Sequence, residues 1–205
     1  YPVVGLLVIG LFMCLINPVV GMLNSALYSG LQAMGEGSKV LLGIVLAAMM
    51  AIDMGGPFNK AAYVFGTSTL ATVAAGQGSE VMAAVMVGGM VPPLAIALAT
   101  TFFKNRFTAE ERKSGVVNYI MGLCFITEGA IPFAAADPLH VLPACIVGSG
   151  LAGALSMAFG CALPAPHGGV FVFPVMTNVL GYLIALAAGS VAGMLLLGLL
   201  KKKKS

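Results

Sequence analysis

Residues 125–138, FITEGAIPFAAADP, place two carboxylates, two prolines and a glycine inside an otherwise apolar sequence. A soluble protein can solvate such a stretch, but this chain has almost no water-facing sequence around it. An ionisable side chain at membrane depth is energetically expensive and therefore marks a functional site. A broken helix at that depth is tolerated only where protein buries it or a water-filled cavity faces it. The stretch therefore predicts a polar substrate site within a membrane bundle.

The composition excludes a soluble globular domain. Of the 205 residues, 60% are hydrophobic and only 8% are charged, against about 25% charged residues in an average soluble domain. The mean hydropathy is +1.03. Long apolar runs without alternating ~10-residue segments favour helices over a β-barrel, and the 27 glycines fit close helix packing. We therefore predict an all-α integral membrane protein, a polytopic helix bundle with re-entrant hairpins or broken helices.

Several apolar segments are long enough to cross a bilayer, which takes about 20 residues in a helix. The segments that we expect to span are residues 1–31, 81–103, 141–166 and 168–200. Proline interrupts the first at Pro18 and the second at Pro92 and Pro93, so both helices are expected to bend there. The last segment has room for one further element.

The charged segments predict the topology. Lys104–Lys113 and Lys201–Lys204 concentrate most of the basic residues, and the positive-inside rule places both on the cytoplasmic side. The chain between them must then cross the membrane an even number of times. Two of the spanning segments satisfy this count, so residues 115–137 should make no net crossing. A re-entrant hairpin with Glu128 near its tip meets that requirement.

A second break follows Val40–Ile52, whose 13 residues would make a helix of only about 20 Å, shorter than the ~30 Å hydrocarbon core. The break itself, DMGGPFNK at Asp53–Lys60, joins polar groups to glycine and proline. Short apolar segments that meet at such a break are typical of discontinuous membrane helices lining a binding site. The alternative is a loop at the membrane face, with Asp53 and Lys60 solvated.

The two breaks resemble each other. Each has a carboxylate four residues before a Pro-Phe pair, Asp53 before Pro57 and Glu128 before Pro132, with glycine in between. The likeness is short enough to arise by chance. If it is structural, it predicts paired broken elements from two halves of the bundle, as in transporters.

The sparse polar residues of the breaks define the candidate site. Glu128 leads, because apolar sequence bounds it on both sides, and the substrate-binding set that we predict is Glu128, Thr127, His167, Asp53, Asn59 and Lys60. His167 either belongs to a plain Pro-Gly turn or donates to a substrate hydroxyl. Asp137, followed by Pro138, is expected to be a helix N-cap. Such a set suits a neutral polyhydroxylated ligand or a proton or sodium relay.

Other functions lack support in the sequence. There is no HExxH, Walker, GxSxG or Rossmann motif, and the four cysteines stand singly in apolar runs, so we expect no metal, cofactor or disulfide. The Lys201–Lys204 cluster follows a membrane segment and is interpreted as a cytoplasmic anchor against membrane lipid, not as a nucleic-acid site. No signal peptide is visible, and Tyr1-Pro2 leads directly into an apolar run, as expected for a fragment.

Five motifs together resemble the membrane (IIC) component of fructose-type sugar phosphotransferase systems. They are YPVVGLLVIG (1–10), DMGGPFNKAAY (53–63), GGMVPP (88–93), FITEGAIPFAAADP (125–138) and APHGGVF (165–171). The resemblance runs almost the whole length. It implies a single membrane domain over residues 1–205, the C-terminal part of a IIC permease domain whose N-terminal helices are absent.

The resemblance also implies a function and partners. A bacterial plasma-membrane subunit would bind fructose or a related sugar and present it to a phosphorylated IIB domain, with IIA and the general phosphocarrier upstream. Glu128 matches a glutamate implicated in binding sugar hydroxyls, and His167 and Asp53–Lys60 match other motif positions. No cysteine here matches that of IIB, so no catalytic residue is expected in this chain. Homodimers are implied for the full-length protein.

Two other hypotheses remain open on the sequence. A cation-coupled secondary transporter, with Glu128 and Asp137 carrying protons, would release unmodified solute, whereas the phosphotransferase would yield phosphosugar. A membrane scaffold subunit would explain the apolar runs but not the polar breaks.

Overall fold

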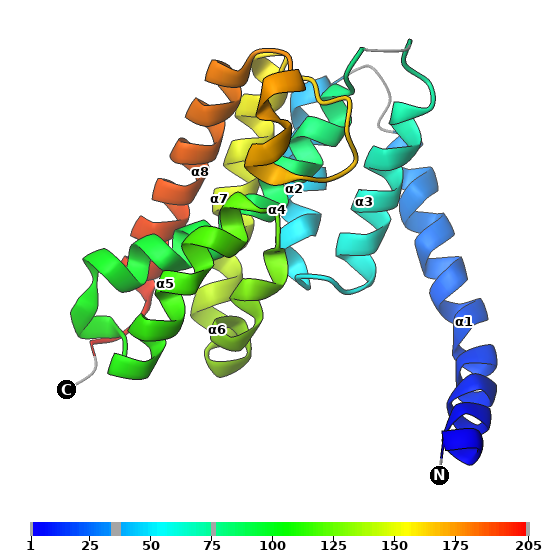
Figure 1. The fold of residues 1–205 in the computed structure, drawn as a ribbon, viewed down its shortest axis with the longest axis horizontal. Coiled ribbons are helices and arrows are strands. Elements are labelled where there is room, and N and C mark those ends of the chain that lie inside the picture. Colours follow the sequence, from blue (N-terminus) through cyan, green and yellow to red (C-terminus); the bar gives the residue numbers. More distant parts are fainter. Residues whose placement is uncertain (1, 34–37, 75–76, 204–205) are drawn as a thin grey trace.

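A computed structural model describes residues 2–33, 38–74 and 77–203, and it is built from helices (Figure 1). The α-helices are α1 (Pro2–Ala33), α2 (Lys39–Ile52), α3 (Pro57–Leu70), α4 (Glu80–Phe102), α5 (Ala109–Leu123), α6 (Ile131–Ala136), α7 (Pro138–Ala158) and α8 (Val179–Leu200). The 3-10 helices are η2 (Lys104–Arg106), η3 (Thr127–Ala130) and η4 (Gly169–Val175). Within these residues the only β-structure is two isolated bridges, which confirms the predicted all-α fold.

Four helices, α1, α4, α7 and α8, are long and apolar enough to cross a membrane. They correspond to the four predicted spanning segments, and the predicted first helix is confirmed as one element that continues through Pro18. The N-terminal part of α1 projects away from the bundle and is exposed, whereas its C-terminal end packs against α3 (Figure 1).

The core forms around α4, which α2, α5, α7 and α8 surround. Its side chains are buried from Met82 to Leu94 on every face, as expected for a helix that is apolar all round. Small residues let the neighbouring helices approach closely. A methyl group on Gly148 of α7 would lie 2.6 Å from the Gly189 carbonyl oxygen of α8, so glycine is required where these backbones meet.

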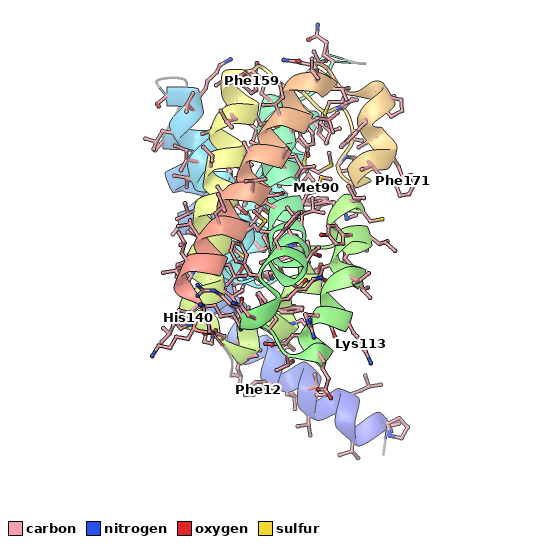
Figure 2. The ribbon with its side chains drawn as sticks, turned by 90° about the vertical axis from the view of Figure 1, so that its left-hand side faces the viewer. Phe12, Met90, Lys113, His140, Phe159 and Phe171 are labelled. Carbon is pink, nitrogen blue, oxygen red and sulfur yellow. The ribbon has the colours of Figure 1, made fainter. Side chains whose placement is uncertain are left out.

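Several charged segments meet at one end of the bundle, which we call the basic end: Lys104–Lys113, the junction of α6 with α7, and the end of α8. The Lys201 ammonium lies 3.4 Å from Glu111 and 3.2 Å from Asp137, and the Arg106 guanidinium donates to the Lys201 carbonyl. In Figure 2, Lys113 and His140 lie at this end and Phe159 at the opposite end. The two basic segments therefore share one side, as the topology required.

The segment from α5 to α6 starts and finishes at the basic end. Lys201 contacts both Glu111, in the first turn of α5, and Asp137, which directly follows α6. Between these points the chain rises to the middle of the bundle and turns back through η3 (Figure 1). We call this segment the lower hairpin, and its tip carries Glu128. It makes no net crossing of the bundle.

A second hairpin, which we call the upper hairpin, consists of α2 and α3 and has its base at the opposite end. Lys39 at the start of α2 forms an ion pair of 3.3 Å with Glu80, the first residue of α4. The Thr69 hydroxyl, near the end of α3, lies 2.5 Å from the Ser79 hydroxyl, which caps α4. The two hairpins thus enter from opposite ends. Whether they are re-entrant in a membrane stays a prediction.

Asp137 is the N-cap residue of α7, as predicted, although its side chain makes no capping hydrogen bond. Its carboxylate instead binds His140 at 2.6 Å and Lys201 at 3.2 Å. Partial burial raises the pKa of Asp137, but the hydrogen bonds and charges of His140 and Lys201 outweigh that effect, so the pKa lies below its usual value.

Candidate functional site

A cavity of about 220 Å³ lies where the tips of the two hairpins meet. The residues that line it are Met50, Asn59, Lys60, Tyr63, Phe125, Thr127, Glu128 and His167. They come from the upper hairpin, the lower hairpin and the loop between α7 and α8. Segments that are far apart in sequence therefore form one open, concave site between helices, a usual place for a ligand.

Five of the six predicted site residues line this cavity: Glu128, Thr127, His167, Asn59 and Lys60. They divide by burial. Asn59 and Thr127 are buried at its floor, whereas Lys60, Glu128 and His167 are exposed at its rim. The cavity therefore combines a dry floor with a charged, accessible rim. The assignment of these residues to a substrate stays a prediction.

The sixth residue, Asp53, lies outside the lining and organises the upper hairpin. Its carboxylate accepts hydrogen bonds from the backbone N–H groups of Phe58, at 2.7 Å, and Asn59, at 2.9 Å. These donors belong to the first turn of α3, which has no helical partners for them. A carboxylate at a helix N-terminus also interacts favourably with the helix dipole. Asp53 thereby fixes the start of the helix that carries Asn59 and Lys60.

Asn59 and Thr127 are both anchored to neighbouring backbone. The Asn59 side-chain amide donates to the Met50 carbonyl at 2.9 Å, which ties α3 to α2. The Thr127 hydroxyl donates to the Gly89 carbonyl in the middle of α4 at 2.8 Å. Each buried polar side chain thus has a partner, and the floor of the cavity is pre-formed.

The tips of the two hairpins touch at Gly55 and Glu128. A methyl group added to Gly55 would lie 3.3 Å from the Glu128 carboxylate oxygen Oε1, and the φ of Gly55, 116°, suits glycine. Phe125 also has a positive φ, 61°, at the turn that begins the lower tip. The pairing of two broken elements, which the sequence echo predicted, is therefore present in space.

His167 reaches the cavity from the loop between α7 and α8. This loop is anchored at the opposite end by hydrogen bonds between Ser79 and Leu163. The loop also carries η4, and the imidazole ring of His167 lies 4.9 Å from the Phe125 ring, centroid to centroid. The Pro-Gly segment is thus part of a loop that runs from the end of the bundle to the cavity and places the His167 imidazole there.

Sequence reasoning missed three lining residues: Met50, Tyr63 and Phe125. Tyr63 follows Asn59 by four residues, so helical spacing alone places both side chains on one face of α3. Its ring lies 6.4 Å from that of Phe125, which starts the lower tip. No polar signal marks Met50, because its place in the lining depends on how α2 packs against the lower hairpin.

The chemistry of the cavity favours binding over bond-making. An ionised carboxylate accepts two hydroxyl protons, while ammonium, amide and imidazole groups donate to hydroxyl or carbonyl oxygens. Aromatic faces at Tyr63 and Phe125 add apolar contact area. The four cysteines are free, and the described residues contain no group of three or more His, Cys, Asp or Glu side chains able to hold a metal.

Together, the fold and the cavity define a polytopic membrane protein with a polar site between two helical hairpins. A family model described as "Phosphotransferase system, EIIC" matches residues 2–148. The chain therefore belongs to the EIIC family of the phosphotransferase system, which confirms the resemblance drawn from its motifs. This membership favours the phosphotransferase hypothesis over a cation-coupled transporter.

Curated relatives place the chain within a subgroup of that family. It is 49% identical over 203 residues to the PTS system fructose-specific EIIABC component of Bacillus subtilis, covering 98% of this chain and 31% of that protein. It is 49% identical to the Fructose permease IIC component of Bacillus amyloliquefaciens, covering 65% of it. It is 50% identical to the PTS system fructose-specific EIIB'BC component of Escherichia coli. The chain thus spans about a third to two thirds of these relatives. No solved structure matches it significantly.

Proposed function

We propose that this chain is the sugar-translocating part of a fructose phosphotransferase permease and binds fructose in the cavity between the hairpin tips. The sugar is then presented to a phosphorylated IIB domain, which supplies the phosphoryl group. The names of the relatives support both the sugar and the IIB partner, since several combine B and C components in one fructose-specific protein. IIA and the general phosphocarrier would act upstream of IIB, and the full-length protein would be a homodimer.

The observation that carries the proposal is the convergence of Glu128, His167 and Lys60 at the rim of one small cavity. Its volume, about 220 Å³, is below the roughly 300–1,000 Å³ of sites for drug-sized ligands, which suits a monosaccharide. Glu128 accepts from two sugar hydroxyls, and Lys60 and His167 donate to ring or hydroxyl oxygens. A neutral sugar needs no counter-charge, so charged groups on the protein can remain solvated at the rim.

The paired hairpins support an alternating-access mechanism. Each tip contributes part of the site, so outward movement of either hairpin opens the cavity toward the end from which that hairpin enters. By the positive-inside rule, the basic end faces the cytoplasm of a bacterial plasma membrane, and IIB meets the sugar from that side. The phosphorylated product carries negative charge and no longer matches the Glu128 carboxylate, which favours its release.

The test is uptake of labelled fructose into membrane vesicles with and without phosphorylated IIB. The proposal predicts accumulation of fructose phosphate inside only when the donor is present, and no dependence on a proton or sodium gradient. Uptake of unmodified fructose driven by a gradient would overturn it in favour of a secondary transporter.

A further inference from the structure

The middle of α4 contains GGMVPP, residues 88–93, two glycines followed by two prolines at a spacing of four. In an α-helix each backbone N–H donates to the carbonyl four residues earlier. Proline has no N–H, so Pro92 cannot donate to Gly88 and Pro93 cannot donate to Gly89. Two successive carbonyls are thus left without helical partners in the most buried helix of the bundle, where an unpaired polar group is costly.

Each of the two carbonyls has a side-chain donor from another element. The Ser149 hydroxyl of α7 donates to the Gly88 carbonyl at 2.8 Å, and the Thr127 hydroxyl of the lower hairpin donates to the Gly89 carbonyl at 2.8 Å. Both hydroxyl-bearing residues are buried. Ser149 belongs to a long helix packed along α4, whereas Thr127 belongs to the tip that carries Glu128.

Gly89 leaves room for the lower hairpin, and Gly88 leaves room for α2. A methyl group on Gly89 would lie 2.7 Å from the Thr127 hydroxyl oxygen and would also collide with the Phe125 ring. A methyl group on Gly88 would lie 2.5 Å from the backbone of Ala47 in α2. Glycine therefore lets α2 and the lower hairpin approach α4, and the proline four residues later leaves each glycine carbonyl free for a side-chain donor.

We propose that Gly89 and Pro93 form a docking point that sets the position of the lower hairpin, with Thr127 as its positioning residue. This inference rests on the proposed function, because it concerns how Glu128 is held at the sugar cavity. Thr127 acts through the Gly89 carbonyl rather than by direct contact with the sugar. When the hairpin moves away, the carbonyl loses the one side-chain donor that it has among the described residues, so the docked position is favoured.

The proposal makes the effect of Thr127 depend on Pro93. Thr127→Val keeps the shape of the side chain but removes the donor and leaves the Gly89 carbonyl unpaired, which should weaken fructose binding about tenfold, the equivalent of roughly 1.4 kcal/mol. Pro93→Ala restores an N–H at position 93, so the carbonyl regains a helical partner. In that background, Thr127→Val should cost less than about threefold. Thr127→Ser retains the hydroxyl and should restore most of the affinity.

Fructose binding and thermal melting are measured on the purified unaltered protein, Thr127→Val, Pro93→Ala and the double variant, which together form a double-mutant cycle. The matched control is Ser149→Ala, alone and with Pro92→Ala. Ser149, Gly88 and Pro92 repeat the arrangement of Thr127, Gly89 and Pro93, but Ser149 belongs to α7 and not to the lower hairpin. Ser149→Ala should lower the melting temperature, since it orphans the Gly88 carbonyl, yet leave fructose affinity within about twofold. A purely structural effect of Thr127 would lower melting in the same way without a matching loss of affinity.

Three results would overturn the docking point: normal fructose affinity in Thr127→Val, an undiminished penalty in the Pro93→Ala background, or an equal loss of affinity in Ser149→Ala. The second of these would make Thr127 a direct sugar ligand. Failure of the proposed function is a separate result, namely no fructose binding by the unaltered protein. In that case the melting cycle alone decides the docking point, and additive effects of Thr127→Val and Pro93→Ala on melting would refute it.

Discussion

Asp53 offers a sharp test of how the upper hairpin is held. Its carboxylate accepts two backbone hydrogen bonds, at 2.7 and 2.9 Å, from the first turn of α3. Replacing a capping side chain by alanine costs about 0.5–2 kcal/mol, and hydrogen bonds to charged groups lie at the upper end of such ranges. We therefore expect Asp53→Ala to cost about 2 kcal/mol of stability. Asp53→Asn keeps one neutral acceptor and should cost about half as much.

The stability cost of Asp53→Ala also sets an upper limit on its effect on fructose affinity. Asp53 lies outside the cavity lining, so it influences fructose only through α3, which carries Asn59 and Lys60. A loss of 2 kcal/mol corresponds to about 30-fold in an equilibrium constant, and affinity should fall by no more than that. Thermal melting and fructose binding are measured together, with Glu110→Ala as a control at an exposed acid of α5.

The expected order of melting temperatures is unaltered protein, then Asp53→Asn, then Asp53→Ala. Unchanged melting in Asp53→Ala would refute the capping role. Loss of fructose binding with unchanged melting would instead make Asp53 a direct sugar ligand, as the sequence first predicted.

Two further predictions concern the basic end. Lys201→Met removes a buried ammonium that lies near both Glu111 and Asp137. The free energy of unfolding should fall by about 1–2 kcal/mol, a discounted value because the two carboxylates are partly exposed. Lys202→Met, at an exposed position, should cost nothing measurable. The folded-state pKa of Asp137 is lowered, so its contribution to stability is complete above its unfolded pKa and is lost as the pH falls through the folded pKa. Below about pH 4, the melting temperatures of the unaltered protein and of Asp137→Asn should therefore converge as the pH falls. A constant difference between them would contradict this.

Apolar runs and the few charges were sufficient to predict the coarse fold. The charge at Lys104–Lys113 and Lys201 predicted a shared end, and the structure places Arg106 against the Lys201 carbonyl. The count of crossings then required residues 115–137 to turn back. The all-α fold and the four long apolar helices were predictable because hydrophobic length does not depend on side-chain detail. The topology in a membrane stays a prediction.

The details of the site depended on tertiary contacts that the sequence does not encode locally. Asp137 occupies the predicted N-cap position of α7, but its carboxylate binds His140 and Lys201, and Lys201 is distant in sequence. Met50 carries no polar signal, and its place in the cavity follows from helix packing. The GGMVPP segment was interpreted as a bend, whereas its freed carbonyls are hydrogen-bonded by Ser149 and Thr127. Which donors find those carbonyls depends on which elements reach α4.

The most direct test of the central claim is equilibrium binding of labelled fructose to Glu128→Gln, with Glu110→Gln as the matched control at an exposed acid outside the cavity. The exchange keeps the shape of the side chain but replaces a carboxylate that accepts two hydroxyl protons by a neutral amide. Hydrogen bonds to a charged group are worth about 1.5–3 kcal/mol, so affinity should fall at least about tenfold with unchanged melting and membrane insertion. Normal fructose affinity in Glu128→Gln would contradict the assignment of the cavity as the sugar site.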